Sequence, residues 1–306
     1  MIRNEFVARA GTVLPPLVSP FDADENLDLS ALEKNSASLA SKGIRGFVCL
    51  GSNSEAVHLS YAEKVASISA VRDSVPEDCV VLAGTGVDSV RETVRLTKAA
   101  AEAGAELALV ITPYFYGKGS SGVPFLRRYY TEVAEAADIP VLIYDVTKYT
   151  GVSLTADFVL ELLEHPNIVG IKDSSGLLET LSLIEREAPD SIPLVGTASS
   201  FLEARKLGIP GGVMALANSH PAELLRLDEL GRAGAHLEAE QLQRDLAELN
   251  TAVTATFGIA GLKEACRVRG YDAGHVRSPL GPLDPTSAST LVELVHEVDE
   301  RIGARA

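Results

Sequence analysis

The feature that most constrains the fold of this chain is a short apolar segment, rich in β-branched residues, that recurs through its first 220 residues. These segments begin about 19 to 34 residues apart, which is the length of a β-strand together with a crossover helix. Near-continuous apolar strands are typical of a parallel sheet that is covered on both faces. The eight expected strands are 12–18, 45–50, 79–84, 107–111, 140–144, 167–172, 192–196 and 211–216.

Helical patterns fill the intervals between these segments. Ser60, followed three residues later by Glu63, is typical of a capping box, and Gly104 is typical of a helix C-cap. The expected helices include 28–42, 60–71, 89–103 and 155–164. The repeat of eight strands with helices between them predicts an α/β fold, a (β/α)₈ TIM barrel. A doubly wound open sheet is less favoured, because no GxGxxG follows the first strand and eight strands close a barrel without remainder.

The last part of the chain predicts a helical addition to this barrel. Helices are expected at 221–233, 235–256, 259–269 and 286–303. The second of them carries an expected buried stripe of Leu237, Leu242, Leu246 and Leu249. We therefore predict a catalytic barrel over residues 1–220 and a C-terminal helical extension over residues 221–306.

Composition and patterning exclude several classes of function. A net charge of −15 and a pI near 4.9 argue against a nucleic-acid partner, which requires a basic surface. The three cysteines and six histidines are too scattered to predict a disulfide framework or a metal site. The N-terminus is too polar for a signal peptide and no apolar run reaches the ~18 residues of a membrane span, so we expect a cytoplasmic protein without a membrane partner. The segment 117–122, GKGSSG, lacks the spacing of a phosphate loop and is expected to form a rim loop.

Active-site residues of a (β/α)₈ barrel lie at the carboxyl ends of its strands, so the polar residues that end strands are the candidates. Lys172 is the only lysine that ends an expected strand. Alternation along this strand places Ile168, Gly170 and Lys172 on one face and Val169 and Ile171 on the other. A solvated lysine in a strand–helix loop is the alternative, because most lysines lie at protein surfaces.

If Lys172 faces the barrel interior, burial disfavours its charged form. Lowering a lysine pKa from about 10.4 to about 7.5 requires roughly 4 kcal/mol, and the neutral amine can then form a Schiff base with a carbonyl. Tyr144 ends the preceding strand, and strands about 4.8 Å apart allow both side chains to reach one substrate, where a phenol can transfer a proton. Ser52 and Asn53 end the second strand, where their polar groups can hold a carboxylate. An aromatic residue with an ordinary hydrogen bond and an ordinary turn are the alternatives at these positions.

These candidates stand in stretches that resemble a known superfamily, that of dihydrodipicolinate synthase and N-acetylneuraminate lyase, which are class I aldolases that handle pyruvate. The resemblance runs from about residue 12 to about residue 285 and rests on the combination of PPLVSPF, GSNSE, LAGTG, VITPY, LIYDV, GIKDSSG and GGVMALAN. Within the superfamily the chain is most similar to 4-hydroxy-2-oxoglutarate aldolase, through RGFVCLGSNSE, HPNIVGIKDSSG and FGIAGLKEACRVRGYDAGHVRSPL.

The resemblance implies a role for individual residues. Lys172 forms the Schiff base with a 2-oxo acid, Tyr144 is the proton shuttle, and Ser52 passes protons. The substrate-binding positions that it implies are Asn53, which helps to hold the carboxylate, Ser174 near the distal end of the substrate, Gly196, Met214 and Tyr116. It also implies a homotetramer built from dimers, without a metal and without a cofactor.

Three departures from the superfamily pattern bear on the substrate. Tyr149 stands where dihydrodipicolinate synthase has an arginine that grips a substrate carboxylate, which makes that synthesis less expected. Phe115 stands where a tyrosine commonly reaches into the site of the neighbouring subunit, and Tyr116 is a candidate replacement for it. Asp145 and Thr147 replace an amide and a proline after the fifth strand.

The leading functional hypothesis is a carbon–carbon lyase that cleaves a 4-hydroxy-2-oxo acid into pyruvate and an aldehyde such as glyoxylate. Two alternatives share this chemistry: a dehydratase or aldolase of a 2-keto-3-deoxy sugar acid, and a dihydrodipicolinate synthase-like enzyme. An alternative of another class is a non-catalytic protein that binds a 2-oxo acid, since a fold alone does not establish an activity.

Overall fold

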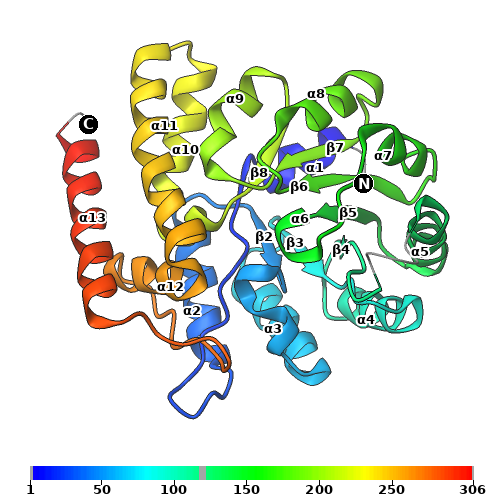
Figure 1. The fold of residues 1–306 in the computed structure, drawn as a ribbon, viewed down its shortest axis with the longest axis horizontal. Helices are drawn as coiled ribbons and strands as arrows, with labels where there is room; N and C mark the ends of the chain where they lie inside the picture. Colours follow the sequence, from blue (N-terminus) through cyan, green and yellow to red (C-terminus); the bar gives the residue numbers. More distant parts are fainter. Residues whose placement is uncertain (1–2, 117–121, 305–306) are drawn as a thin grey trace.

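The computed structural model describes residues 3–116 and 122–304 and has the architecture of a (β/α)₈ barrel with further helices after it (Figure 1). In Figure 1 the barrel helices surround the strands, and the C-terminal helices stand together on one side of the barrel. The rim loop expected at 117–122 lies outside the described residues except for Gly122. The strands are β1 (Val13–Leu14), β2 (Gly46–Cys49), β3 (Val80–Gly84), β4 (Leu107–Ile111), β5 (Val141–Asp145), β6 (Ile168–Asp173), β7 (Ile192–Val195) and β8 (Gly211–Val213).

The strands form one closed sheet. All neighbours pair in parallel, in the order β1-β8-β7-β6-β5-β4-β3-β2. The two remaining edges meet where the Leu17 N–H donates to the Val48 carbonyl at 2.9 Å and the Val48 N–H donates to the Pro15 carbonyl at 3.0 Å. The eight expected strands are therefore confirmed. β1 is shorter than expected because Pro15 and Pro16 have no N–H group for a regular ladder.

Local signals in the sequence set several helix ends. The Asp28 carboxylate caps α2 by accepting a hydrogen bond from the Ala31 N–H at 2.9 Å. The capping box of Ser60 and Glu63 begins α3, and Gly104, with φ +93°, follows the end of α4. The helices between the strands are α2 (Leu29–Ser41), α3 (Tyr61–Ser74), α4 (Val90–Glu102), α5 (Val123–Ala136), α6 (Thr147–Thr150), α7 (Ala156–Leu162), α8 (Leu178–Glu187) and α9 (Phe201–Lys206).

Side chains alternate along the strands between two packed layers. The barrel interior holds a cluster that includes Leu82, Leu142 and Leu194, and Ile143 belongs to the second core, between sheet and helices. A helix that the sequence patterns did not predict, α1 (Arg3–Ala10), buries Phe6 against the interior cluster. Because α1 leads directly into β1, it covers the amino end of the barrel and leaves the carboxyl end for a site.

The expected alternation along β6 is wrong at two positions, Ile168 and Val169. Val141 of β5 pairs with Ile168, but the next residue, Leu142, pairs with Gly170, so Val169 is an extra residue in the ladder. Ile168 consequently packs in the core under the helices, while Val169 packs against the interior cluster. Beyond this bulge the expected alternation holds, and Lys172 faces the barrel interior.

The chain after β8 forms α10 (Pro221–Arg232), α11 (His236–Thr251), α12 (Gly258–Val268) and α13 (Pro285–Gly303). The single helix expected over 235–256 is divided, because α11 ends at Thr251 and a π-helical segment, η5 (Ala252–Thr256), leads into α12. Within the described ranges no helix is both long enough and apolar enough to span a bilayer. The domain boundary at residue 220 stays a prediction.

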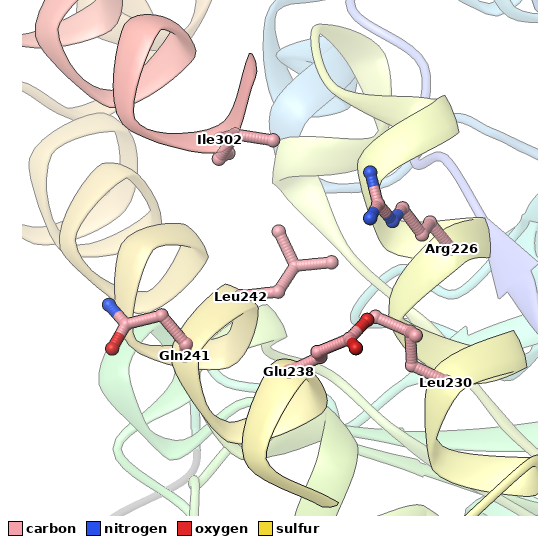
Figure 2. A pocket seen from close by; sticks show the side chains of 6 residues that line it. All are labelled: Arg226, Leu230, Glu238, Gln241, Leu242 and Ile302. Atoms are coloured by element: carbon pink, nitrogen blue, oxygen red, sulfur yellow. The ribbon is translucent and has the colours of Figure 1, made fainter. Parts of the chain in front are cut away.

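The expected apolar stripe of α11 is confirmed at three of its four positions. Leu242, Leu246 and Leu249 are buried, but Leu237 is 85% exposed. The separation of five positions between Leu237 and Leu242 corresponds to a rotation of about 140° around the helix, which turns Leu237 away from the buried face. Figure 2 shows Leu242 beside a small cavity of about 50 Å³ between α10, α11 and α13. A space of this size suits about one or two water molecules and is no candidate substrate site.

A buried ion pair connects the C-terminal helices to the loop after β2. Lys263 of α12 is 1% exposed and donates hydrogen bonds of 2.7 Å to the Glu55 carboxylate and to the Ser19 carbonyl. Burial lowers the pKa of Lys263, and the charge of Glu55 opposes that effect. Both residues stand in stretches that carry the family resemblance, but no role was predicted for either of them.

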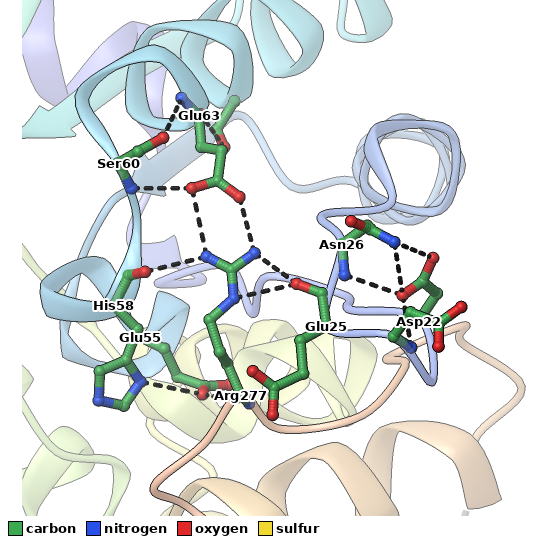
Figure 3. A network of polar contacts seen from close by, with 10 residues as sticks. Asp22, Glu25, Asn26, Glu55, His58, Ser60, Glu63 and Arg277 are labelled. Carbon is green, nitrogen blue, oxygen red and sulfur yellow. Dashed lines mark hydrogen bonds and ion pairs between the residues drawn. The ribbon is translucent and has the colours of Figure 1, made fainter.

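Arg277 extends this connection, as Figure 3 shows. Its backbone N–H donates to the Glu55 carboxylate at 2.9 Å, and its guanidinium donates to Glu63 at 2.7 Å and to the His58 carbonyl at 2.9 Å. The bond from Arg277 lowers the pKa of Glu63 to about 2. The loop after β2 is thus fixed from the C-terminal side by one buried lysine and one arginine.

Lys263→Met leaves the Glu55 carboxylate buried without its ammonium partner, so we expect the free energy of unfolding to fall by about 3–5 kcal/mol. Adding Glu55→Gln removes the unpaired charge and recovers part of that loss. Urea unfolding of both variants measures these changes. Lys34→Met, at an exposed position of α2, is the matched control and should change stability by less than about 0.5 kcal/mol. A double variant no more stable than Lys263→Met contradicts the assigned pairing.

Candidate active site at the carboxyl ends of the barrel strands

The pairing of β5 with β6 brings the two principal candidates together. Tyr144 is the register partner of Lys172, and the Lys172 Nζ atom lies 4.0 Å from the centre of the Tyr144 ring. Each residue is 3% exposed. Among the residues that the structure describes, no carboxylate forms an ion pair with Lys172. The two side chains can therefore reach one small substrate, as their strand positions suggested, while their chemical roles stay predictions.

The loop after β2 brings Ser52 to the same place. The Ser52 Oγ atom and the Tyr144 hydroxyl oxygen are 3.2 Å apart, which is hydrogen-bond distance. Leu50 and Glu55, on either side of this segment, have left-handed φ angles of +62° and +54°, a conformation that non-glycine residues seldom adopt. Gly84 of β3 makes room for the first of these bends, since a Cβ there would lie 2.1 Å from the Leu50 carbonyl oxygen.

A cavity of about 240 Å³ opens beside these side chains. The expected site residues that line it are Ser52, Asn53, Tyr144, Lys172, Ser174 and Gly196. Two further expected positions do not reach it. Met214 is fully buried in the core under the helices, although its neighbours Val213 and Ala215 line the cavity, and Tyr116 is 66% exposed outside it.

Gly196 allows the ends of β6 and β7 to approach closely. Its N–H donates to the Asp173 carbonyl at 2.7 Å. A Cβ at position 196 would lie 2.0 Å from the Ser174 Oγ atom and 2.7 Å from the Ser174 Cα atom. Any larger residue at position 196 would therefore displace Ser174 from the cavity. This close approach accounts for the glycine, and no contact between Gly196 and a substrate is needed to explain it.

A second cavity, of about 530 Å³, adjoins the first and shares Ser52, Tyr144, Tyr149 and Ile259 with it. Tyr114, in the loop after β4, lines this larger space. Phe115, which stands at the position of the superfamily tyrosine, is 74% exposed and lines neither cavity. The homotetramer and any contribution of this loop to a neighbouring subunit stay predictions.

Residues that the sequence analysis did not select complete the smaller cavity. Lys148 lies in the turn after β5, next to Tyr149, and Thr197 follows Gly196. The C-terminal segment adds Val253, Thr254, Ala255, Gly258 and Ile259, from η5 and the beginning of α12. Lys148 and Thr197 could have been selected as polar residues that follow a strand end, but the return of η5 to the barrel mouth has no signature in the sequence.

Among the described residues, the smaller cavity is lined by two lysines, Lys148 and Lys172, and by no carboxylate. The carboxylates that end β5 and β6, Asp145 and Asp173, are register partners of each other and line neither cavity. Among the described residues no three histidine, cysteine or acidic side chains are grouped so that they could hold a metal ion. The lining is thus suited to an anionic ligand.

Asp145 shapes the turn after β5 from the side opposite the cavity. Its carboxylate accepts hydrogen bonds from the Leu154 N–H at 2.9 Å and from the Thr147 hydroxyl at 3.3 Å. Burial raises the pKa of Asp145 to about 6, and the negative charge of Asp173 adds to that effect. The pKa of Asp173 is raised as well, by burial. These two carboxyl groups lie at the beginning of the loops that follow β5 and β6. Burial disfavours their charged forms, so their ionisation destabilises the folded state.

Asp145→Asn is expected to raise the free energy of unfolding at pH 8. The folded state favours the protonated carboxyl, with a pKa of about 6 against an ordinary 3.8, so the wild type loses this stabilisation as the pH rises from about 4 to about 6. An amide can still accept the Leu154 hydrogen bond and carries no charge. Urea unfolding should show the advantage of the variant growing by roughly 1 kcal/mol between pH 5.5 and pH 8. An advantage of equal size at both pH values contradicts the raised pKa.

Comparison with known proteins places this fold and site in a family. The profile of the Dihydrodipicolinate synthetase family matches residues 9–298. The 4-hydroxy-tetrahydrodipicolinate synthase of Methanosphaerula palustris is 35% identical over 291 residues, which cover 94% of this chain and 99% of that protein. A dihydrodipicolinate synthase structure from Bacillus anthracis superposes with a TM-score of 0.89 at 28% identity, covering 94% of this chain and 98% of the other. A prophage protein of the dihydrodipicolinic acid synthase family from E. coli K12, solved in complex with pyruvate, gives a TM-score of 0.87 at 28% identity over 94% of this chain and 98% of the other. The chain is therefore a class I, Schiff-base carbon–carbon lyase that belongs to the dihydrodipicolinate synthetase family.

Proposed function

We propose that this lyase cleaves a 4-hydroxy-2-oxo acid into pyruvate and an aldehyde such as glyoxylate. The observation that carries the proposal is the position of Lys172, which is almost fully buried, lies 4.0 Å from the Tyr144 ring centre and lines one cavity together with Ser52. An amine beside a phenol can form a Schiff base with a 2-oxo acid and exchange protons with the bound intermediate. The similarity of three long stretches to 4-hydroxy-2-oxoglutarate aldolase supports this class of substrate.

In the first half of the reaction, the neutral Lys172 Nζ attacks the C2 carbonyl of the substrate. Tyr144 delivers a proton to the carbinolamine oxygen, water leaves, and an iminium ion forms. Tyr144 then takes the proton of the C4 hydroxyl as the C3–C4 bond breaks. The electron pair of that bond moves into the iminium group, so that an enamine remains on Lys172 and the aldehyde is released.

In the second half, the enamine carbon accepts a proton and water hydrolyses the resulting iminium ion. These steps release pyruvate and return the free amine. Ser52, at 3.2 Å from the Tyr144 hydroxyl, passes protons between Tyr144 and the rest of the site. Asn53 lines the same cavity, and we propose that it helps to hold the carboxylate next to C2.

Two other reactions would use the same iminium intermediate. A 2-keto-3-deoxy sugar acid dehydratase eliminates water instead of breaking a carbon–carbon bond, and the hydroxyl groups of Ser174 and Thr197 in the cavity favour it as the second candidate. The reaction in the name of the curated relative, 4-hydroxy-tetrahydrodipicolinate synthesis, is the third, although Tyr149 stands where the resemblance to dihydrodipicolinate synthase places an arginine.

Incubation with 4-hydroxy-2-oxoglutarate should release pyruvate and glyoxylate in equal amounts. We expect Lys172→Ala to abolish turnover, and Tyr144→Phe to lower kcat by about 10²–10⁴-fold, the usual contribution of a general acid–base group. Lys98→Ala and Tyr61→Phe, at exposed positions of α4 and α3, are the matched controls and should retain wild-type rates.

The products decide between the candidates. Loss of water without an aldehyde product from a 2-keto-3-deoxy sugar acid assigns the protein as a dehydratase. A cyclic product formed from pyruvate and aspartate semialdehyde assigns it as a synthase. If the folded wild type turns over no 2-oxo acid, the proposed reaction is contradicted. The remaining alternative is then a non-catalytic protein that binds a 2-oxo acid.

A further inference from the structure

The smaller cavity is lined by a second lysine besides Lys172. Lys148 lies in α6, in the turn that directly follows β5, and lines the cavity together with Lys172. Its Nζ atom donates a hydrogen bond of 3.1 Å to the Thr254 carbonyl of η5. An ammonium group has three N–H donors, so this contact leaves two of them for a ligand.

The position of Lys148 is set from two sides. On the barrel side, Asp145 holds the beginning and end of the turn through Thr147 and Leu154. On the C-terminal side, the Thr254 carbonyl anchors the ammonium group at the cavity, and the same residue lines the cavity wall. The Lys148 side chain is exposed, and its hydrogen bond to the Thr254 carbonyl restricts it before a ligand binds, so binding costs less side-chain entropy than for a lysine without such a contact.

The charge balance of the cavity is the second observation. The protein has 42 acidic and 27 basic residues, yet the residues of 3–116 and 122–304 that line the cavity include two lysines and no carboxylate. In the proposed reaction Lys172 forms the covalent bond to C2 of the substrate, and Asn53 helps to hold the carboxylate next to C2. Within the described part of the chain, Lys148 is then the remaining lysine of the lining, and no acidic side chain lines the cavity beside it.

We propose that Lys148 binds a second carboxylate, carried by the part of the substrate that becomes the aldehyde. The inference rests on the proposed function and narrows it: the substrate is a 4-hydroxy-2-oxo dicarboxylate, and the released aldehyde is an anionic 2-oxo acid such as glyoxylate. Lys148 and Tyr149 are adjacent in α6, and both line the cavity. Because the Tyr149 side chain carries no charge, Lys148 is the residue of this pair that can bind a carboxylate. A neutral polyol tail does not require a cation at this position.

The test compares two aldehydes of similar size in the synthetic direction, with pyruvate as the common partner. Glyoxylate carries a carboxylate and acetaldehyde carries a methyl group in its place. For the wild type we expect a higher kcat/KM with glyoxylate. Lys148→Met should lower the ratio of the two kcat/KM values by about 10–100-fold, the range of a charge-assisted hydrogen bond, mainly through KM for glyoxylate. Lys148→Arg should restore most of that ratio.

Lys98→Met is the matched control, an exposed lysine of α4 whose removal should not change the ratio. A ratio unchanged in Lys148→Met overturns the assignment of Lys148, as does a loss that Lys148→Arg does not restore. The proposed function is checked separately by reducing the wild type with borohydride in the presence of pyruvate alone. Absence of a covalent adduct there overturns both proposals, whereas an adduct together with an unchanged ratio overturns only that of Lys148.

Discussion

The structure depends on the register between β5 and β6, and that register depends on one extra residue. Val141 pairs with Ile168, and Leu142 pairs with Gly170, so Val169 has no partner. Because side chains alternate with a period of two, a ladder without this bulge would pair Lys172 with Asp145 and turn its amine toward the helices. With the bulge, Lys172 pairs with Tyr144 and both face the barrel interior. The single unpaired residue therefore decides whether this chain has a Schiff-base site at all.

The segments around Lys172 and Tyr144 are held in place by contacts with other parts of the chain. The segment that carries Ser52 begins and ends at residues with left-handed φ angles, and the buried Lys263–Glu55 contact fixes its far end. Such backbone conformations persist where the surrounding structure determines them, and here α12 supplies the determining contact. The same C-terminal segment lines the cavity through η5. The helical extension thus completes the site, although its residues take no part in the proposed bond breaking.

The sequence predicted the parts of the fold that local patterns encode. Eight apolar runs and the helical patterns between them predicted the barrel, and Lys172 was selected because it is the only lysine that ends an expected strand. The bulge at Val169 could not be predicted, because it depends on how β6 meets its neighbour. Leu237 was assigned to the wrong face by counting leucines without their rotation around the helix. Lys263 did leave a signal, a lysine between Leu262 and Cys266 on the apolar face of α12, but its partner lies 208 residues away in the chain.

The most direct test of the account is to locate the bond to substrate. The protein is incubated with pyruvate, reduced with borohydride, digested, and its peptides are weighed. The account predicts one reduced pyruvate unit per chain, on the peptide that contains Lys172, and no adduct in Lys172→Arg, which keeps a long side chain but not the nucleophilic amine. An unmodified wild-type protein, or an adduct on any other lysine, contradicts the central claim that the register of β5 and β6 creates the reactive site.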